Sequence, residues 1–119
     1  MDFDVYQQKS RTTAVYPTYY IKTEAGEFVP VPYTYPSLGM GGESGEVLEK
    51  VKKIARDNDG QLDESRKEML IYELGDVLWY MASICTELGI PMSEVAEKNI
   101  KKLQARLNTG TLHGEGDVR

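Results

Sequence analysis

The chain has 119 residues, of which 40% are hydrophobic and 28% are charged, and its formal net charge is −5. This composition is typical of a single folded domain over residues 1–119 and excludes a largely disordered chain. The acidic balance argues against nucleic acid as a partner, because binding to phosphate backbones relies on an excess of Lys and Arg. The sequence also has no run of about 20 apolar residues of the kind that crosses a membrane, so no membrane partner is expected.

Cys85 is the single cysteine, so the chain cannot form an intrachain disulfide. Its apolar neighbours predict a small buried side chain and not a nucleophile. The N-terminus lacks the basic start of a signal peptide. We therefore expect a cytoplasmic protein in a reducing compartment.

The first part of the chain predicts a helix followed by a small β element. A short amphipathic helix is expected from Asp2 to about Ala14. The next stretch, 15–36, is rich in Pro, Tyr and Thr and is not expected to be helical. Within it, residues 19–23 and 27–29 flank a Gly turn, which indicates a short hairpin or an ordered loop. Pro30 and Pro32 are expected to end the second strand.

The rest of the chain predicts three further helices. They run from about Leu38 to Asp57, from residues 63–64 to Leu88, and from residues 91–93 to about Leu107, separated by Gly-containing breaks. The tail, 111–119, has no apolar period and is expected to be coil.

Two segments on these helices place acidic residues three positions apart. They are Glu43-Ser44-Gly45-Glu46 and Glu73-Leu74-Gly75-Asp76. Residues at i and i+3 share a helix face, and the leading acid of each pair lies at the edge of the apolar stripe. Since a short turn makes the two helices antiparallel neighbours, the four carboxylates are expected to converge at their seam.

Such a convergence is unfavourable unless a cation offsets it. Two like charges 4 Å apart repel by roughly 4 kcal/mol at an effective dielectric near 20. Carboxylate oxygens suit a hard divalent cation, so the pattern predicts a Mg²⁺ or Mn²⁺ site. The alternative is that these are ordinary surface acids paired with Lys50, Lys53 and Lys67.

These acidic segments resemble a known family. Gly42 to Val47 and Tyr72 to Trp79 are similar to the E-x-x-E and E-x-x-D signature of the all-α nucleoside triphosphate pyrophosphohydrolases, in particular the small MazG-like proteins. Tyr6-Gln7, Lys52-Lys53 and the stretch 99–106 extend the resemblance over most of the chain. The region 19–36 matches no part of that pattern.

The resemblance implies an all-α, four-helix MazG-like bundle with a hairpin or loop insertion between the first and second helices. It implies Mg²⁺-dependent hydrolysis of (deoxy)nucleoside triphosphates to a nucleoside monophosphate and pyrophosphate. Glu43, Glu46, Glu73 and Asp76 would then be both the metal ligands and the catalytic residues. A phosphoribosyl-ATP or dUTP/dCTP-specific pyrophosphohydrolase, and a non-catalytic helical interaction module, remain as alternatives.

The same resemblance implies substrate contacts from the basic residues. Asn99, Lys102 and Arg106 in the last helix, and Lys53, would bind phosphate or nucleotide. Lys and Arg near a helix C-terminus are also expected from the helix dipole alone. The family is oligomeric, so a homodimer or homotetramer is expected. Because Trp79 lies outside the main apolar stripe, we expect it to be buried between subunits.

Overall fold

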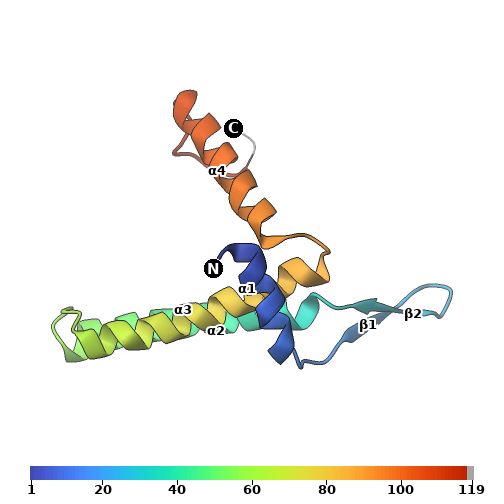
Figure 1. The fold of residues 1–119 in the computed structure, drawn as a ribbon, viewed down its shortest axis with the longest axis horizontal. Coiled ribbons are helices and arrows are strands. Elements are labelled where there is room, and N and C mark those ends of the chain that lie inside the picture. Colours follow the sequence, from blue (N-terminus) through green and yellow to red (C-terminus); the bar gives the residue numbers. More distant parts are fainter. Residues whose placement is uncertain (118–119) are drawn as a thin grey trace.

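The computed structural model describes residues 1–117 and is helical apart from one small sheet (Figure 1). Its element order confirms the predicted all-α class with a hairpin insertion. The elements are α1 (Phe3–Ser10), a 3-10 helix (Arg11–Thr13), β1 (Tyr19–Lys22), β2 (Phe28–Val31), α2 (Thr34–Asp57), α3 (Glu64–Glu87) and α4 (Met92–Asn108). Among these described residues, no helix is long and apolar enough to span a membrane.

The central feature is the long antiparallel pair of α2 and α3 (Figure 1). Asp59 and Gly60 adopt positive φ angles of 53° and 74° in the connection, which reverses the chain. Asp63 then caps α3, because its carboxylate accepts a hydrogen bond from the Arg66 backbone N–H at 2.8 Å. Close packing of the pair requires glycine at position 39, where an added Cβ would lie 2.3 Å from the Tyr80 ring.

Helix α2 begins at Thr34, four residues before the predicted start at Leu38. The expectation that residues up to Pro36 are not helical was therefore wrong. Pro36 is the third residue of α2, and a proline is tolerated there because the first-turn N–H groups have no intrahelical acceptor. The ring of Pro36 is fully buried in this position.

The predicted hairpin is present as an antiparallel pair in which Tyr19 faces Val31 and Tyr20 faces Pro30. Gly26 provides its turn with a φ of 85°. The prediction that Pro30 ends the second strand was wrong, since β2 continues to Val31, but Pro32 directly follows the last residue of the strand as expected. Pro30 is accommodated because β2 is an edge strand, where an outward-facing N–H is not needed for pairing.

The core of the chain lies where α1 crosses the C-terminal half of α3. Ala82, Cys85 and Met92 are buried there, and Tyr6, Leu78, Met81 and Ile90 pack against them. The burial of Cys85 was predicted. The apolar stripe expected on α3 from its helical spacing, Leu70, Leu74, Val77, Met81, Ile84 and Leu88, is covered only in part. Met81 packs against the core, whereas Leu74 and Leu88 are more than half exposed and Ala82, outside the stripe, has no exposed surface.

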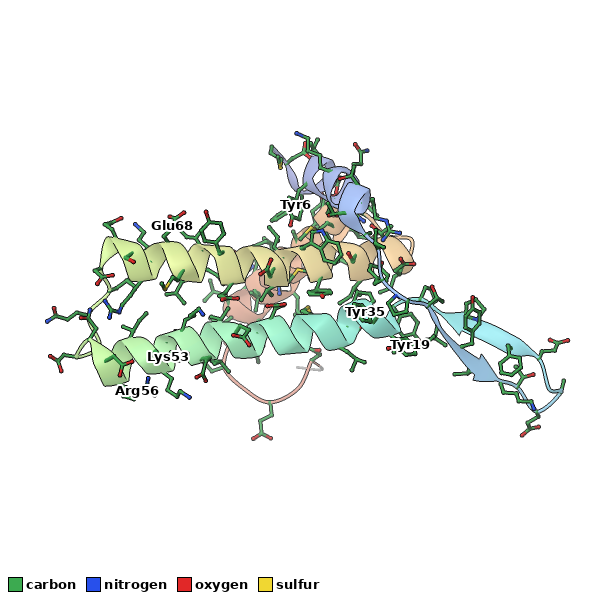
Figure 2. All side chains as sticks on the ribbon, turned by 90° about the horizontal axis from the view of Figure 1, so that it is seen from below. Tyr6, Tyr19, Tyr35, Lys53, Arg56 and Glu68 are labelled. Atoms are coloured by element: carbon green, nitrogen blue, oxygen red, sulfur yellow. The ribbon has the colours of Figure 1, made fainter. Side chains whose placement is uncertain are left out.

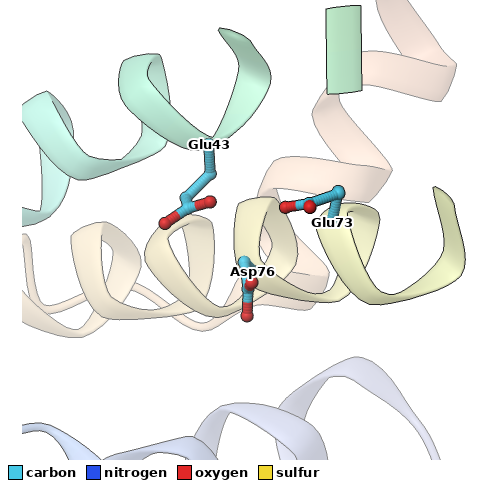
Figure 3. A group of neighbouring side chains, drawn as sticks. All are labelled: Glu43, Glu73 and Asp76. Carbon is cyan, nitrogen blue, oxygen red and sulfur yellow. The ribbon is translucent and has the colours of Figure 1, made fainter. Parts of the chain in front are cut away.

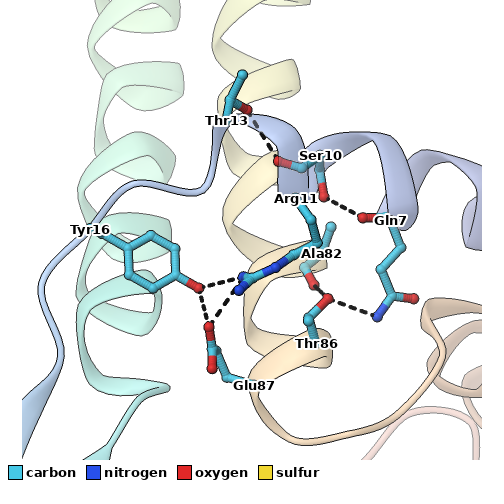
Figure 4. Close-up of polar contacts among 8 residues, drawn as sticks. All are labelled: Gln7, Ser10, Arg11, Thr13, Tyr16, Ala82, Thr86 and Glu87. Carbon is cyan, nitrogen blue, oxygen red and sulfur yellow. Dashed lines mark hydrogen bonds and ion pairs between the residues drawn. The ribbon is translucent and has the colours of Figure 1, made fainter.

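Polar contacts fix α1 against the end of α3 (Figure 4). The Gln7 amide donates to the Thr86 hydroxyl and to the Ile90 carbonyl, and its oxygen accepts from the Met92 N–H. Arg11 pairs with Glu87 at 3.1 Å. Hydrogen bonds to backbone groups at the α3–α4 turn satisfy polar atoms that would otherwise be partly buried without partners.

Asp4 links the same helix α1 to α4. Its carboxylate accepts hydrogen bonds from the backbone N–H and the hydroxyl of Ser93, at 3.0 and 2.7 Å. These bonds lower the pKa of Asp4 below its ordinary value. Asp4 thus caps the first turn of α4 from a different element, where the N-terminal N–H groups lack intrahelical partners.

Trp79 packs within its own chain and is not left in water. Its indole N–H donates to the Thr13 hydroxyl at 2.9 Å, and its ring makes edge contacts with Tyr16 and Tyr80 at centroid distances of 6.2 and 5.1 Å. Tyr35 stacks on Tyr16 and completes the aromatic cluster. The inference that a single chain leaves Trp79 uncovered was therefore wrong, because the segment after α1 covers it.

Helix α4 projects away from the α2–α3 pair (Figure 1). The radius of gyration is 18.2 Å, compared with roughly 13–14 Å for a compact domain of this length. Val95, Ile100, Leu103 and Leu107 on α4 are all exposed. The four helices are therefore present as predicted, but one chain by itself does not close them around a common core.

Candidate metal and active site

Three of the four predicted carboxylates come together between α2 and α3 (Figure 3). Glu43 extends from α2, and Glu73 and Asp76 extend from one face of α3, three residues apart. One oxygen from each lies within 4.8 Å of the others. Glu43 and Glu73 are half-buried and Asp76 is exposed, so the group opens to solvent on one side.

The cluster carries unbalanced negative charge. Burial raises the pKa of Glu43 above its ordinary value, and the charges of Asp76, Glu73 and Glu46 raise it further. The pKa of Tyr6 is likewise raised by burial and by Asp76, and that of Tyr80 is raised by burial with contributions from Tyr35, Glu43 and Asp76. The surrounding side chains thus experience a local negative field.

Within residues 1–117, Lys50 is the cation that pairs with this group, with its Nζ 3.4 Å from a Glu73 carboxylate oxygen. The alternative interpretation, that the acids are ordinary surface residues paired with lysines, therefore holds for the Glu73 carboxylate. Lys53 instead lies 3.8 Å from Glu49, on the same helix. One lysine against three carboxylates leaves a net negative charge, which a divalent cation with oxygen ligands would neutralise. The donor set therefore fits Mg²⁺ or Mn²⁺.

Glu46 lies outside the three-carboxylate group. It is exposed on α2, one turn beyond Glu43, and its charge still contributes to the raised pKa of Glu43. It is therefore close enough to act on the cluster electrostatically.

Comparison with known proteins decides the family. The profile of the MazG nucleotide pyrophosphohydrolase domain matches residues 37–111, which include all four acids and all of α4. The chain belongs to the MazG nucleotide pyrophosphohydrolase family. It is also similar to the Gene 37 protein of Mycobacterium phage L5, with 39% identity over 120 residues that cover 100% of both chains. No solved structure matches it significantly.

The matched MazG domain begins at residue 37, so α1 and the hairpin lie before it. The acidic cluster, α3 and all but the first three residues of α2 lie inside it. Members of this family act on nucleotide substrates.

Lys53 lines a cavity of about 390 Å³ beside the acidic cluster of the MazG domain. The cavity is lined by Lys50, Lys53, Ile54, Asp57, Ser65, Arg66 and Met69. Three of these residues are cationic, and Lys50 connects the cavity to Glu73 through its ion pair. Arg66 was not predicted as part of the site. Its place in the first turn of α3 gave no signal beyond its charge, and only the antiparallel pairing brings it opposite Lys53.

The other predicted substrate contacts lie on α4, away from the carboxylates of the same chain (Figure 1). Asn99 is exposed. Lys102 and Arg106 pair with Asp117 of the tail at 3.0 and 3.2 Å, and Arg106 is only 6% exposed. The tail up to residue 117 therefore contacts the basic face of α4, while Val118 and Arg119 lie outside the described residues.

Proposed function

We propose that this MazG-family protein hydrolyses (deoxy)nucleoside triphosphates to a nucleoside monophosphate and pyrophosphate, using Mg²⁺ or Mn²⁺. The observation that carries the proposal is the group formed by Glu43, Glu73 and Asp76, whose oxygens lie within 4.8 Å of one another. Its position inside the region that matches the nucleotide pyrophosphohydrolase profile supports the substrate class.

These three carboxylates would hold the cation, with Glu46 as a further ligand or a water-mediated one. When bound, the cation would make a water molecule more acidic and neutralise charge on the phosphates. The carboxylates themselves would orient that water, and one of them would accept its proton. The oxygen of the water would form a bond to the α-phosphorus while the bond from that phosphorus to the bridging oxygen breaks. Pyrophosphate would leave with the electron pair.

The cations nearest to the cluster suggest how the phosphates would be held. Lys50, Lys53 and Arg66 line one cavity next to Glu73. Since guanidinium and ammonium groups bind phosphate oxygens strongly, this cavity is suited to the phosphate chain. Asn99, Lys102 and Arg106 lie on α4, which projects away from the α2–α3 pair that forms this cavity (Figure 1).

A second copy of the chain would supply these α4 residues, which is why we propose that the active unit is a homodimer or a homotetramer. The accessible surface of the chain is 8647 Å², whereas a compact monomer of this size exposes roughly 6,500 Å². The excess, roughly 2,000 Å², is comparable to what an obligate partner covers. Exposed apolar residues occur on α4 and on the α2–α3 pair alike, including Leu103, Leu107, Leu48 and Leu74.

Glycines in α2 and α3 support close approach by another molecule. At Gly41, Gly42, Gly45 and Gly75, an added Cβ would meet nothing within 4 Å. Glycine in a helix interior costs about 1 kcal/mol relative to alanine, and at these four positions the chain itself does not require the small side chain. A packed second helix or a bound nucleotide would require it.

Release of pyrophosphate from the eight common ribo- and deoxyribonucleoside triphosphates, assayed with and without Mg²⁺, tests the proposal. Phosphorus NMR should show a monophosphate and pyrophosphate as the first products. Asp76→Asn and Glu46→Gln should abolish turnover, while Glu68→Gln, an exposed acid on the outer side of α3 (Figure 2), should not. First release of inorganic phosphate would contradict the reaction type. Absence of turnover and of metal binding would favour the interaction-module alternative.

Subunit complementation tests the shared site. Asp76→Asn removes a ligand from the acidic cluster and Arg106→Ala removes a cation from α4, so each variant alone should be inactive. When the two variants are mixed and allowed to exchange subunits, some sites combine an intact cluster with an intact α4, and activity should return. If activity does not return although subunits exchange, α4 acts on the cluster of its own chain.

A further inference from the structure

The hairpin of β1 and β2 lies apart from the helices and from the family-matched region (Figures 1 and 2). Both of its faces are apolar and exposed: Tyr20, Ile21 and Phe28 are 60%, 58% and 68% exposed. A two-stranded hairpin without further packing is marginally stable in water, and a third strand or a packed surface stabilises it. The proposed hydrolysis does not account for this element.

The pairing pattern shows which backbone groups face outward. The Thr23 N–H donates to the Glu27 carbonyl at 2.8 Å, so this pair is of the hydrogen-bonded type. Since the two types alternate along an antiparallel ladder, the pairs Ile21–Val29 and Tyr19–Val31 are also hydrogen-bonded. The N–H and C=O groups of Tyr20 and Lys22 therefore point outward from β1. No hydrogen bond to these groups occurs within the described residues.

The two edges of the hairpin differ in their ability to take another strand. Pro30 faces outward on β2 and has no N–H to donate, which blocks that edge against further pairing. On β1, Tyr20 and Lys22 offer both donors and acceptors. A strand can therefore add to β1 but not to β2.

We propose that β1 pairs antiparallel with β1 of a second copy of this chain, around a two-fold axis at Ile21. In this register Ile21 faces Ile21 of the partner subunit, and Tyr20 faces Lys22 of the partner subunit. No like charges are opposed, and the lysine ammonium would lie near an aromatic ring, as the Lys22 Nζ already lies over the Phe28 ring at 5.9 Å from its centroid. The strand is thus complementary to itself.

The β2 edge, which Pro30 blocks, explains why the sheet stops growing once two copies have paired through β1. Pairing through β1 gives a four-stranded sheet in which both outer strands are β2. Each outer edge then carries Pro30, so no further strand can add. An isologous contact of this kind closes the sheet at two hairpins, so the sheet itself does not propagate into a fibre.

Oxidative cross-linking of purified full-length protein tests the register. Ile21→Cys should form a disulfide-linked dimer on mild oxidation, because directly opposed residues of a non-hydrogen-bonded pair have Cα atoms about 4.5 Å apart. Val29→Cys is the matched control on the same face of β2, where the two copies would be separated by about 14 Å. The native Cys85 is buried and does not interfere. No cross-link at position 21, or equal cross-linking at both positions, would overturn the proposal.

A charge substitution gives an independent readout. In the homotetramer proposed above, this contact would join two helix-mediated dimers. Ile21→Lys, which places two lysines on the axis, should therefore halve the mass measured by light scattering, while Val29→Lys should leave the mass unchanged. Circular dichroism should show equal helix content in both variants, because the hairpin lies apart from the helices. An unchanged mass for Ile21→Lys would refute the pairing. The readouts are proximity and mass, so failure of the proposed hydrolysis would not affect them.

Discussion

Replacement of Glu43 by glutamine should raise the stability of the metal-free protein. It should also reduce the additional stability that the protein gains on binding the metal. Glu43, Glu73 and Asp76 lie within 4.8 Å of one another, so before solvent screening each ionised pair repels by at least about 3.5 kcal/mol at an effective dielectric of 20. Glu43→Gln removes two of these repulsions without changing the shape of the side chain. Since Asp76 is exposed to solvent, screening reduces the gain to about 1 kcal/mol.

Thermal unfolding with and without Mg²⁺ measures both effects. At a Mg²⁺ concentration ten times the dissociation constant, binding should stabilise the wild-type protein by about 1.4 kcal/mol, which corresponds to about 5 °C in melting temperature for a domain of this size. Glu43→Gln should start from a higher melting temperature in EDTA and lose most of the shift with Mg²⁺.

Glu68→Gln removes one charge from the same acidic protein and serves as the control, since Glu68 is exposed on α3 outside the cluster. It should retain the full Mg²⁺ shift. If Glu43→Gln lowers the melting temperature in EDTA and retains the full shift with Mg²⁺, then the three carboxylates neither repel one another strongly nor bind the metal.

Three further predictions concern the fold. Gly39→Ala should lower the free energy of unfolding in urea by about 1–3 kcal/mol, because its Cβ would lie 2.3 Å from the Tyr80 ring; the control Gly41→Ala, which meets nothing, should not destabilise. Ser83→Ala should raise the same free energy by about 1 kcal/mol, because the buried Ser83 hydroxyl has no partner among the described residues, and a loss of stability would point to a hydrogen bond there. Asp4→Asn should lower the melting temperature at neutral pH. The folded-state pKa of Asp4 lies below the ordinary 3.8, so the stabilisation by its carboxylate is present above that value and is lost as the pH falls through the folded-state pKa. The melting temperatures of wild type and variant should therefore converge in acid. A difference that stays constant with pH would refute this assignment.

The sequence alone determined the local elements and the acidic pattern. Helix ends follow from capping and breaking residues, and Asp63 caps α3 as its position before the apolar run predicts. The convergence of Glu43 with Glu73 followed from two i,i+3 pairs on helices joined by a short turn. These inferences depend on contacts within a few residues, or on one antiparallel pairing, and the sequence carries both.

The tertiary structure decided which faces are covered and which residues meet. Periodicity located an apolar stripe on α3 but did not show that α1 packs on the side of Ala82, because that choice depends on where a distant helix crosses. In the same way, Trp79 is covered by the segment around Thr13 and Tyr16, 66 and 63 positions earlier in the chain. The position of α4 depends on its contacts with α1 and α3. That position keeps Arg106 away from the acids, although all of them lie in the region that matches the family profile. Long-range packing of this kind is set by the sum of many weak contacts between elements, and no local pattern in the sequence records it.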